Sequence, residues 1–329
     1  SKRVCNETYV ICMKAPKTPP VRILLVGFGR MGISHLSIMS GLLQPKQIEV
    51  HIVDSSFASR MIAKELVADA KVYKSLKVVE KSFSDTYFDF CLITTPPIER
   101  VELVSQASKL AKAVFIEKPL MIHLDTNHMS GYVLQHAPLN VKVFDYLAGK
   151  NISAINARLT TNISFESIEK GWRSSKFGTV LYEFGGHLLT LVGSTSGMEN
   201  FLDSDFKLSD ISVSKLEKNY ASLTFPSGDS FVSVELIAGS HEVRKASYEI
   251  EFITNEGVYT YDLYSFKLRS SNDCDDEVIF NIAAMDTSTD FYVRGFEFSF
   301  QMQAFISGNF DVLTTTQISN VEKIIDGVS

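Results

Sequence analysis

Three glycines have the spacing of a dinucleotide-binding turn, within the segment Gly27-Phe28-Gly29-Arg30-Met31-Gly32. In such a turn the first glycine permits the tight bend, the second lets the backbone approach a pyrophosphate, and the third lets the helix pack closely on the strand. The segment follows the apolar run Ile23–Val26 and opens an amphipathic stretch, so free N–H groups at a helix start would meet the phosphates. These six residues are predicted to bind a dinucleotide; a glycine turn that serves packing alone is the alternative.

Asp54 ends the next apolar run, at the distance from Gly32 where dinucleotide-binding domains place an acidic residue. A carboxylate there can accept both hydroxyls of the adenosine ribose and would repel a 2′-phosphate, which favours NAD. NADP stays open, because Ser55, Ser56 and Arg60 would line a 2′-phosphate site if Asp54 turned aside. The other interpretation of Asp54 is a turn residue or a cap for the following helix.

A lysine follows the apolar run Val114–Ile116, within the segment Glu117-Lys118-Pro119. Proline disfavours helical conformation at the preceding residue and removes a backbone donor, which predicts an extended exit from the strand. Glu117 and Lys118 would then meet the cofactor, and the ammonium could hydrogen-bond a substrate oxygen; an exposed loop lysine is the alternative. Thr94, Thr95 and Pro96, within the segment Thr94–Pro97, end another strand on this edge and either contact the cofactor or only terminate the strand.

Glu183 and His187 belong to a polar line, with Thr190 and Ser194, along an otherwise apolar helix predicted near residues 178–194. A helix that is apolar over most of its surface is buried, and a buried ionisable pair is costly unless it is partnered or faces a wet cavity. Imidazole titrates near neutrality, which suits His187 to remove a proton from an alcohol. Glu183 would orient that ring or hold a substrate hydroxyl. The pattern leaves a purely structural histidine equally open.

The composition is that of a globular protein, with 45% apolar and 21% charged residues among 329. The net charge is −6 and the basic residues are scattered, so no nucleic-acid partner is expected. No apolar run approaches the ~18–20 residues of a membrane span. The first 20 residues lack the apolar core of a signal peptide, so no membrane partner and a cytoplasmic location are expected. The four cysteines lack C-x-x-C spacing, which indicates a reducing compartment, and no metal site is predicted.

The elements that must position these residues change in kind near residue 146. Before it, short β-rich runs alternate with amphipathic stretches, which predicts a doubly wound parallel sheet covered by helices on both sides. This Rossmann domain is predicted for residues 21–148, after an N-terminal extension of residues 1–20. The predicted strands are 21–28, 49–54, 89–95, 113–117 and Asn140–Tyr146, and the predicted helices are 30–43, 58–67, 99–111 and Leu124–Gln135.

Residues 149–329 are predicted to form an α+β domain with an open, mostly antiparallel sheet. Alternating segments are separated by the turn sequences Pro226–Asp229 and Asn255–Gly257, as expected of hairpins. Two helices near residues 292–306 and 315–327 close the chain. An open sheet exposes one face, so we expect a homodimer or homotetramer. The predicted strands are 153–161, 207–217, 220–225, 229–238, 246–254, 257–268 and 277–283.

From about residue 21 to the C-terminus, the chain resembles the Gfo/Idh/MocA family of oxidoreductases, named after glucose–fructose oxidoreductase and inositol dehydrogenase. The resemblance rests on GFGRMGISH, TTPP, EKPL, WRSS and GTVLYEFGGHLLTL in this order, then an aromatic helix with Phe305 and the segment Thr314–Thr316 before the last helix. It implies catalytic roles for Lys118 and His187, with the histidine as acid/base. It also implies that Trp172 and Arg173 lie in the substrate site, and that the second sheet makes oligomer contacts.

Three features depart from the family's pattern. Glu183 stands where the family has aspartate, and Arg100 where a histidine is common. Only Leu147–Asn151 separates the predicted strand Asn140–Tyr146 from the next domain, where many relatives have an arginine-containing segment and a helix. We expect this loss to open the pocket or to alter the substrate.

The expected function is NAD(P)-dependent hydride transfer to or from a carbon that bears oxygen, in a sugar, nucleotide sugar or polyol. His187 would exchange the hydroxyl proton, Lys118 would polarise the oxygen and Glu183 would position the substrate. One alternative is a reductase of an imine or pyrrole-type ring, which the short linker favours. Another is a non-catalytic dinucleotide-binding sensor or assembly subunit, which Glu183 and Arg100 favour.

Overall fold

The computed structural model describes most of the chain from residue 19 onward. The predicted N-terminal extension, except Pro19 and Pro20, lies outside the described residues, and so do Gly228 and Asp229 of a predicted turn. The described ranges are 19–44, 47–83, 85–120, 122–175, 177–195, 198, 201–227, 230–243, 247–263, 267–272, 275–280 and 293–328.

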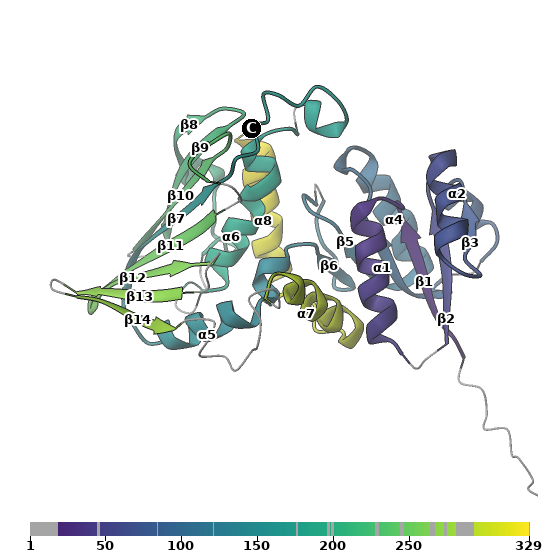
Figure 1. Cartoon of the computed structure of the whole chain (residues 1–329), viewed down its shortest axis with the longest axis horizontal. Helices are drawn as coiled ribbons and strands as arrows, with labels where there is room; N and C mark the ends of the chain where they lie inside the picture. The colour runs from purple at the N-terminus through teal and green to yellow at the C-terminus, as the bar shows by residue number, and fades with distance from the viewer. Residues whose placement is uncertain are drawn as a thin grey trace, which may run out of the picture.

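A parallel sheet with the strand order β3-β2-β1-β4-β5-β6 forms the first half of the molecule (Figure 1). The order reverses between β1 and β4, and sheets of this type bind ligands beyond the carboxyl ends of their strands at such a point. The strands are β1 (Val21–Val26), β2 (Ile48–Val53), β3 (Lys71–Tyr73), β4 (Phe88–Ile93), β5 (Ala111–Ile116) and β6 (His128–Ser130). The helices are α1 (Arg30–Leu42), α2 (Phe57–Leu66), α3 (Leu76–Glu80) and α4 (Arg100–Leu110).

Both faces of this sheet are buried, which explains why its strands are apolar without alternation. Leu24 and Val26 of β1 pack with residues of α3 and α4 on one face. Ile23 and Leu25 pack on the other face, with residues of α1 and of α7 (Val293–Ser307). The C-terminal part of the chain therefore returns to cover the first sheet.

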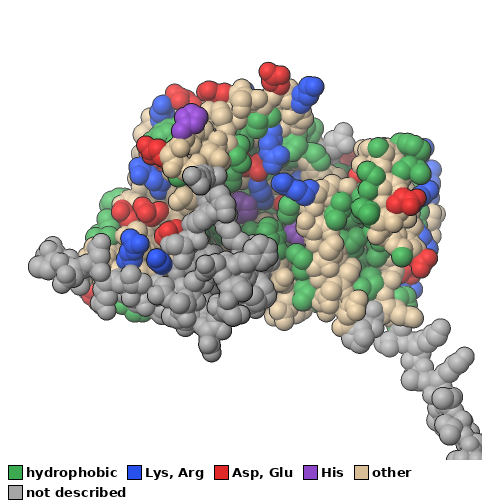
Figure 2. Space-filling model, in the orientation of Figure 1, with side chains coloured by type: hydrophobic (Ala, Val, Ile, Leu, Met, Phe, Trp, Pro, Cys, Tyr) green, Lys and Arg blue, Asp and Glu red, His purple; other side chains and the backbone are tan. Residues whose placement is uncertain are grey.

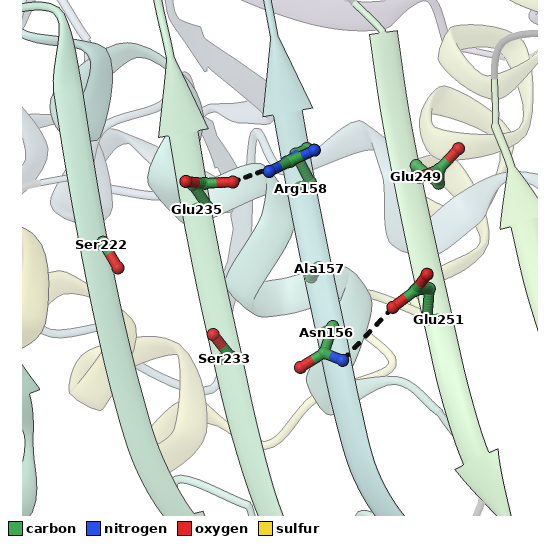
Figure 3. Close-up of a pocket in the computed structure, with 8 residues that line it drawn as sticks. All are labelled: Asn156, Ala157, Arg158, Ser222, Ser233, Glu235, Glu249 and Glu251. Carbon is green, nitrogen blue, oxygen red and sulfur yellow. Dashed lines mark hydrogen bonds and ion pairs between the residues drawn. The ribbon is translucent and has the colours of Figure 1, made fainter.

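A second sheet has the order β14-β13-β12-β11-β7-β10-β9-β8 and is antiparallel except for the neighbours β7 and β10. One face packs on α6 (Gly186–Gly193) and α8 (Thr315–Gly327), and the other is open (Figure 1). On the open face, Arg158 pairs with Glu235 at 2.5 Å, and Asn156 donates to Glu251 at 3.3 Å (Figure 3). The strands are β7 (Ile152–Thr160), β8 (Ser212–Leu216), β9 (Tyr220–Ser227), β10 (Ser230–Ile237), β11 (Ser247–Thr254), β12 (Gly257–Asp262), β13 (Lys267–Asn272) and β14 (Asp275–Phe280).

This arrangement confirms the predicted fold class, a Rossmann sheet followed by an open, mostly antiparallel one. Several elements were predicted wrongly. Strand β3 and helix α3 were not predicted, the predicted strand 257–268 covers parts of two paired strands, β12 and β13, and the predicted strand 207–217 begins with the 3-10 helix Leu208–Asp210. The predicted strand Asn140–Tyr146 is part of helix α5 (Pro138–Leu147), and the predicted helix Leu124–Gln135 instead contains β6 and the start of the short 3-10 helix Val133–His136. A short apolar run fits either period, and the buried apolar residues of the helix, Val143, Phe144 and Leu147, share one helical face.

The expectation of an unusually short connection between the two domains was wrong for the same reason. Because β6 is the last strand of the first sheet, helix α5 follows that sheet in the chain and precedes the second one. Leu147–Asn151 only joins this helix to β7. The segment that connects the two sheets therefore contains a helix, and the expectation that this helix is missing was wrong.

Candidate functional site

A cavity of about 940 Å³ lies at the carboxyl ends of β1, β2 and β4, where the strand order reverses. Its walls include many residues predicted to bind the cofactor: Gly27, Gly29, Asp54, Ser55, Thr94, Thr95 and Pro96. Lys74 and Lys77 also line it and were missed, because no motif distinguishes them from other surface lysines.

The three glycines of the turn have three different surroundings. Gly27 has φ +97°, a conformation that glycine adopts without strain, and its carbonyl accepts from Thr94 Oγ1 at 2.7 Å. A Cβ on Gly32 would lie 2.2 Å from the Gly27 carbonyl oxygen, whereas a Cβ on Gly29 would meet nothing within 4 Å. Gly27 therefore makes the bend, Gly32 the close packing, and Gly29 leaves open space above the turn.

Helix α1 begins at this open space without a side-chain cap. Its N-cap is Gly29, so no side chain takes the first N–H groups of the helix, which are free to hydrogen-bond an anion. The open space and the uncapped start fit the pyrophosphate of a dinucleotide. Phe28 is different, because its side chain is buried in the core with 5% exposure.

The Asp54 carboxylate joins the glycine turn to the end of β2. It accepts from the backbone N–H of Phe28 and of Ser56, both at 2.8 Å, and it also lines the cavity. The cap of helix α2 is Ser56, not Asp54. Arg60 donates to the carbonyl oxygens of Asp54 and Ser55, at 2.8 and 2.7 Å. Asp54 thus orders the glycine turn and forms part of the cavity wall.

A second cavity of about 540 Å³ adjoins the first and brings both halves of the predicted site together. It shares Gly29 and the segment 94–96 with the first cavity. Its other walls include the predicted residues Arg30, Met31, Glu117, Lys118, Trp172, Arg173, Glu183 and His187, together with Arg100.

Glu183 is held by two cations in this cavity. Arg173 binds it with two hydrogen bonds, from Nε to Oε2 at 2.9 Å and from Nη2 to Oε1 at 2.8 Å. Lys118 Nζ donates to Glu183 Oε1 at 3.1 Å and to its backbone carbonyl at 2.9 Å. Burial opposes ionisation of Glu183, but the charge of Lys118 and the hydrogen bonds and charge of Arg173 outweigh it and lower the pKa to about 2. Glu183 is therefore ionised at neutral pH.

His187 lies one turn beyond Glu183, at the start of α6. The two residues are joined by the π-helical turn Leu181–Gly185, a type of irregularity often found at functional sites. Burial, reinforced by the nearby charge of Lys118, lowers the pKa of His187 to about 3, so the ring is neutral at physiological pH. Its Nδ1 is buried and has no hydrogen-bond partner within the described part of the chain.

Tyr132 packs against the His187 ring, and the sequence pattern did not predict this contact. The two rings meet edge to face with centroids 5.7 Å apart, and the Tyr132 hydroxyl donates to the carboxylate of Glu322. A Cβ on Gly186 would lie 2.3 Å from the Tyr132 ring, so this glycine permits the contact. These partners come from distant parts of the chain, and no local motif announces them.

Arg100 and Glu117 fix the loop that carries Lys118. Arg100 is buried and donates to the carbonyl oxygens of Thr95, Glu117 and Pro119. Glu117 pairs with His35 Nε2 at 2.6 Å and accepts from the backbone N–H of Lys118 at 3.0 Å. Arg100 is therefore a clamp between two strand ends.

Two other classes of site receive no support from the residues that the structure describes. Within the described ranges, no three His, Cys, Asp or Glu side chains are grouped as metal ligands would be. Among the helices of those ranges, none combines the length and hydrophobicity of a membrane span.

Comparison with known proteins gives one family match. Residues 21–130 match the Gfo/Idh/MocA model, described as an oxidoreductase family with an NAD-binding Rossmann fold. No curated protein sequence matches the chain. The match agrees with the predicted family and confirms the prediction of an oxidoreductase that uses NAD.

Solved structures of low sequence identity share the fold over almost the whole chain. Scyllo-inositol dehydrogenase from Lactobacillus casei, with bound NAD(H) and scyllo-inositol, is 16% identical with a TM-score of 0.68, covering 93% of this chain and 95% of that chain. Levoglucosan dehydrogenase with NADH and levoglucosan is 14% identical, with a TM-score of 0.72 and coverage of 94% and 96%. UDP-N-acetylglucosamine 3-dehydrogenase from Acidithiobacillus ferrooxidans is 13% identical, with a TM-score of 0.66 and coverage of 94% and 97%.

Proposed function

We propose that this chain, whose residues 21–130 belong to the Gfo/Idh/MocA family of NAD-binding oxidoreductases, interconverts a hydroxyl and a carbonyl group on a sugar, nucleotide sugar or polyol. The observation that carries the proposal is the cavity of about 540 Å³. Its walls combine the dinucleotide turn at Gly29 with Lys118, Glu183 and His187. A substrate carbon in this cavity would lie between the cofactor and three groups that can bind oxygen or move a proton.

The residues of the larger cavity would hold the cofactor. The backbone at Gly29 and the uncapped start of α1 would bind the pyrophosphate, and Asp54 would accept from the adenosine ribose. When bound, the nicotinamide supplies or accepts the hydride. Lys74 and Lys77 also line this cavity, but the Asp54 carboxylate opposes a 2′-phosphate, so we propose NAD rather than NADP.

Lys118 would hold the reacting oxygen of the substrate. An ammonium group has three N–H donors, and two of them are used on Glu183. The third is available for the substrate, where a positive charge stabilises the developing alkoxide. Glu183 Oε1 accepts from both Arg173 and Lys118, while Oε2 accepts from Arg173 alone and can take one more donor, such as a substrate hydroxyl.

His187 would accept the hydroxyl proton when an alcohol is oxidised. Its ring is neutral, and its buried Nδ1 lacks a hydrogen-bond partner among the described residues. A neutral imidazole can accept a proton from an alcohol within hydrogen-bond reach. In the reverse direction it would return that proton to the alkoxide.

The sugar or polyol class is supported by the polar side chains that line the cavity and by the names of structural neighbours. Those neighbours are described as dehydrogenases of scyllo-inositol, levoglucosan and UDP-N-acetylglucosamine. The alternative of an imine or pyrrole reductase rested on a missing helix between the domains, and helix α5 removes that argument. We also propose a cytoplasmic homodimer or homotetramer that uses the open face of the second sheet; light scattering after gel filtration would give the number of subunits.

Turnover and cofactor binding together test the proposal. NADH fluorescence should show binding, and reduction of NAD should appear with at least one member of a panel of hexoses, inositols and nucleotide sugars. His187→Ala should retain NADH binding while kcat falls about 100-fold or more, the usual contribution of a general base. If NADH binds but no panel member is turned over, the chain is a dinucleotide sensor and the proposal fails.

A further inference from the structure

The substrate end of the smaller cavity holds more positive than negative charge. Of the side chains that line this cavity, Arg30, Arg100, Lys118 and Arg173 are basic, while Glu117 and Glu183 are acidic. In the space-filling view, Lys and Arg side chains gather around the hollow between the two halves of the molecule (Figure 2). Charges in a sheltered cavity are costly unless an anion compensates them, so a surplus of this kind points to an anionic occupant.

The surplus is concentrated at Glu183. Lys118 and Arg173 both bind this one carboxylate, at 3.1 and 2.8 Å, which leaves one positive charge without a counter-charge in the group. The remaining charges are committed elsewhere. Arg100 binds three backbone carbonyl oxygens, and its charge is compensated by the nearby carboxylate of Glu117, which also binds His35. Arg30 is the first residue of α1, beside the turn that would hold the pyrophosphate. The negative charge of the cofactor would therefore compensate the positive charge of Arg30.

Arg173 has the geometry of an anion receptor. Its side chain is 37% exposed, against 18% for Lys118 and 13% for Glu183, so it is the most accessible charge of the three. A guanidinium has five N–H donors in a rigid plane, and Glu183 uses only two of them. The Trp172 ring lies 4.5 Å from the guanidinium carbon and restricts its orientation. The planar fork that remains matches a carboxylate or a phosphate.

We propose that the substrate carries an anionic group, a carboxylate or a phosphate ester, and that Arg173 binds this group next to Glu183 while Lys118 and His187 engage the reacting hydroxyl. This inference rests on the proposed function, because it names the class of sugar that the same site selects. It places substrate discrimination in the segment 172–173, apart from the residues that take part in the reaction.

Matched pairs of hexoses provide the test. Glucose, galactose and mannose are compared with the corresponding uronates and 6-phosphates, using the full chain with saturating NAD. For the preferred sugar, kcat/KM should be about 10- to 100-fold higher for an anionic member than for its neutral partner, the effect of a bidentate charged hydrogen bond. Comparison of uronates with 6-phosphates identifies which anion is used. Calorimetric titration of the same compounds into the NADH complex should show the same order of affinity.

Arg173→Leu should remove this preference. Its kcat/KM should fall for both sugars, because Arg173 also holds Glu183, but about 10- to 100-fold further for the anionic sugar than for the neutral one, chiefly through KM. Arg173→Lys keeps the charge but not the planar fork, so the loss for the anionic sugar should be intermediate. This variant provides the test if the leucine variant folds poorly. Arg158→Leu makes the same charge change on the open face of the second sheet and should alter neither value.

The outcomes separate this inference from the proposed function. If neutral sugars are turned over or bound as well as their anionic partners, or if Arg173→Leu affects both equally, Arg173 is a structural partner of Glu183 and the inference is wrong while the proposed function stands. If neither kind of sugar is turned over or bound although NADH binds, both are wrong.

Discussion

The cofactor half and the substrate half of the site are built in different ways. The cofactor half consists mainly of backbone from one continuous turn, in which Gly27 bends the chain, Gly29 leaves open space and Gly32 packs against Gly27. The substrate half consists of side chains from three separate segments, in which Lys118 and Arg173 both form ion pairs with Glu183.

This difference determines how each half should respond to change. A backbone turn depends on the space available at single positions, so one added side chain either blocks the ligand or distorts the turn. In the charged network, Glu183 has two cationic partners, so the loss of either cation leaves the carboxylate paired with the other. We therefore expect all-or-none effects in the cofactor half and separable effects in the substrate half.

The largest effect is expected from Gly29→Asp. A Cβ at this position meets no atom within 4 Å, so the variant should fold normally. Its carboxylate would face the pyrophosphate, and like charges placed together cost several kcal/mol, so NADH affinity should fall about 1,000-fold. Fluorescence titration measures the affinity and thermal unfolding checks the fold.

Gly32→Ala is the matched control within the same turn. Its Cβ would lie 2.2 Å from the Gly27 carbonyl oxygen, so this variant should lose about 1–3 kcal/mol of stability from overpacking. If Gly29→Asp bound NADH within about tenfold of the wild type, the cofactor would not lie over this turn.

The next effect separates the two halves. Lys118→Met removes the cation that would hold the substrate oxygen, while Glu183 keeps both hydrogen bonds from Arg173. We expect kcat to fall about 100-fold, in the range of a lost acid–base or charge-stabilising group, with NADH affinity changed less than about threefold. Steady-state kinetics and fluorescence titration measure the two quantities. An equal loss of NADH affinity would show that the halves are not separable.

The same difference explains what could be predicted from the sequence. The glycine turn and Asp54 have fixed spacings within one strand–helix unit, so pattern alone located the cavity they line. The spacing of Glu183 and His187 likewise indicated that both could face one cavity. The cations that hold Glu183 could not be predicted, because pairing between residues 118, 173 and 183 depends on how the two sheets pack.

Short elements account for the errors in the predicted fold. Strand β6 has only three residues, and two of them, His128 and Ser130, are polar, so no apolar run marks it. The run at 140–146 has strand-like composition, and its helical face is recognised only by the burial of Val143, Phe144 and Leu147. The role of Arg100 as a clamp on three carbonyl oxygens could not be predicted either, because it depends on two strand ends that meet only in the folded chain.

A smaller effect is expected below the His187 ring. Tyr132→Phe keeps the aromatic contact but removes the hydroxyl that donates to Glu322 in the interior. Loss of a buried hydrogen bond to a charged group should lower the free energy of unfolding by about 1–3 kcal/mol. Tyr259→Phe removes a hydroxyl that lies 3.4 Å from the exposed Glu256 and also interacts with Lys150, and it should cost only about 0.5 kcal/mol. Denaturant unfolding measures both variants, and similar losses would mean that the Tyr132 bond has no special role in supporting the substrate half.

The smallest effect is a slope of stability with pH, and it tests whether His187 is held neutral by the fold. Its pKa is about 3 in the folded protein, against about 6.5 in an unfolded chain, so between these values the unfolded state binds more protons. The stability from the neutral ring is complete above pH 6.5 and is lost as the pH falls toward 3. Between pH 7 and 5, the slope that His187 adds should reach at most about 1.4 kcal/mol per pH unit. Glu183 does not obscure this window, because its pKa is lowered from 4.5 to about 2 and its contribution changes only below pH 4.5. His187→Asn should flatten the slope; an equal slope for the variant and the wild type would mean that the ring is protonated as readily in the fold as outside it.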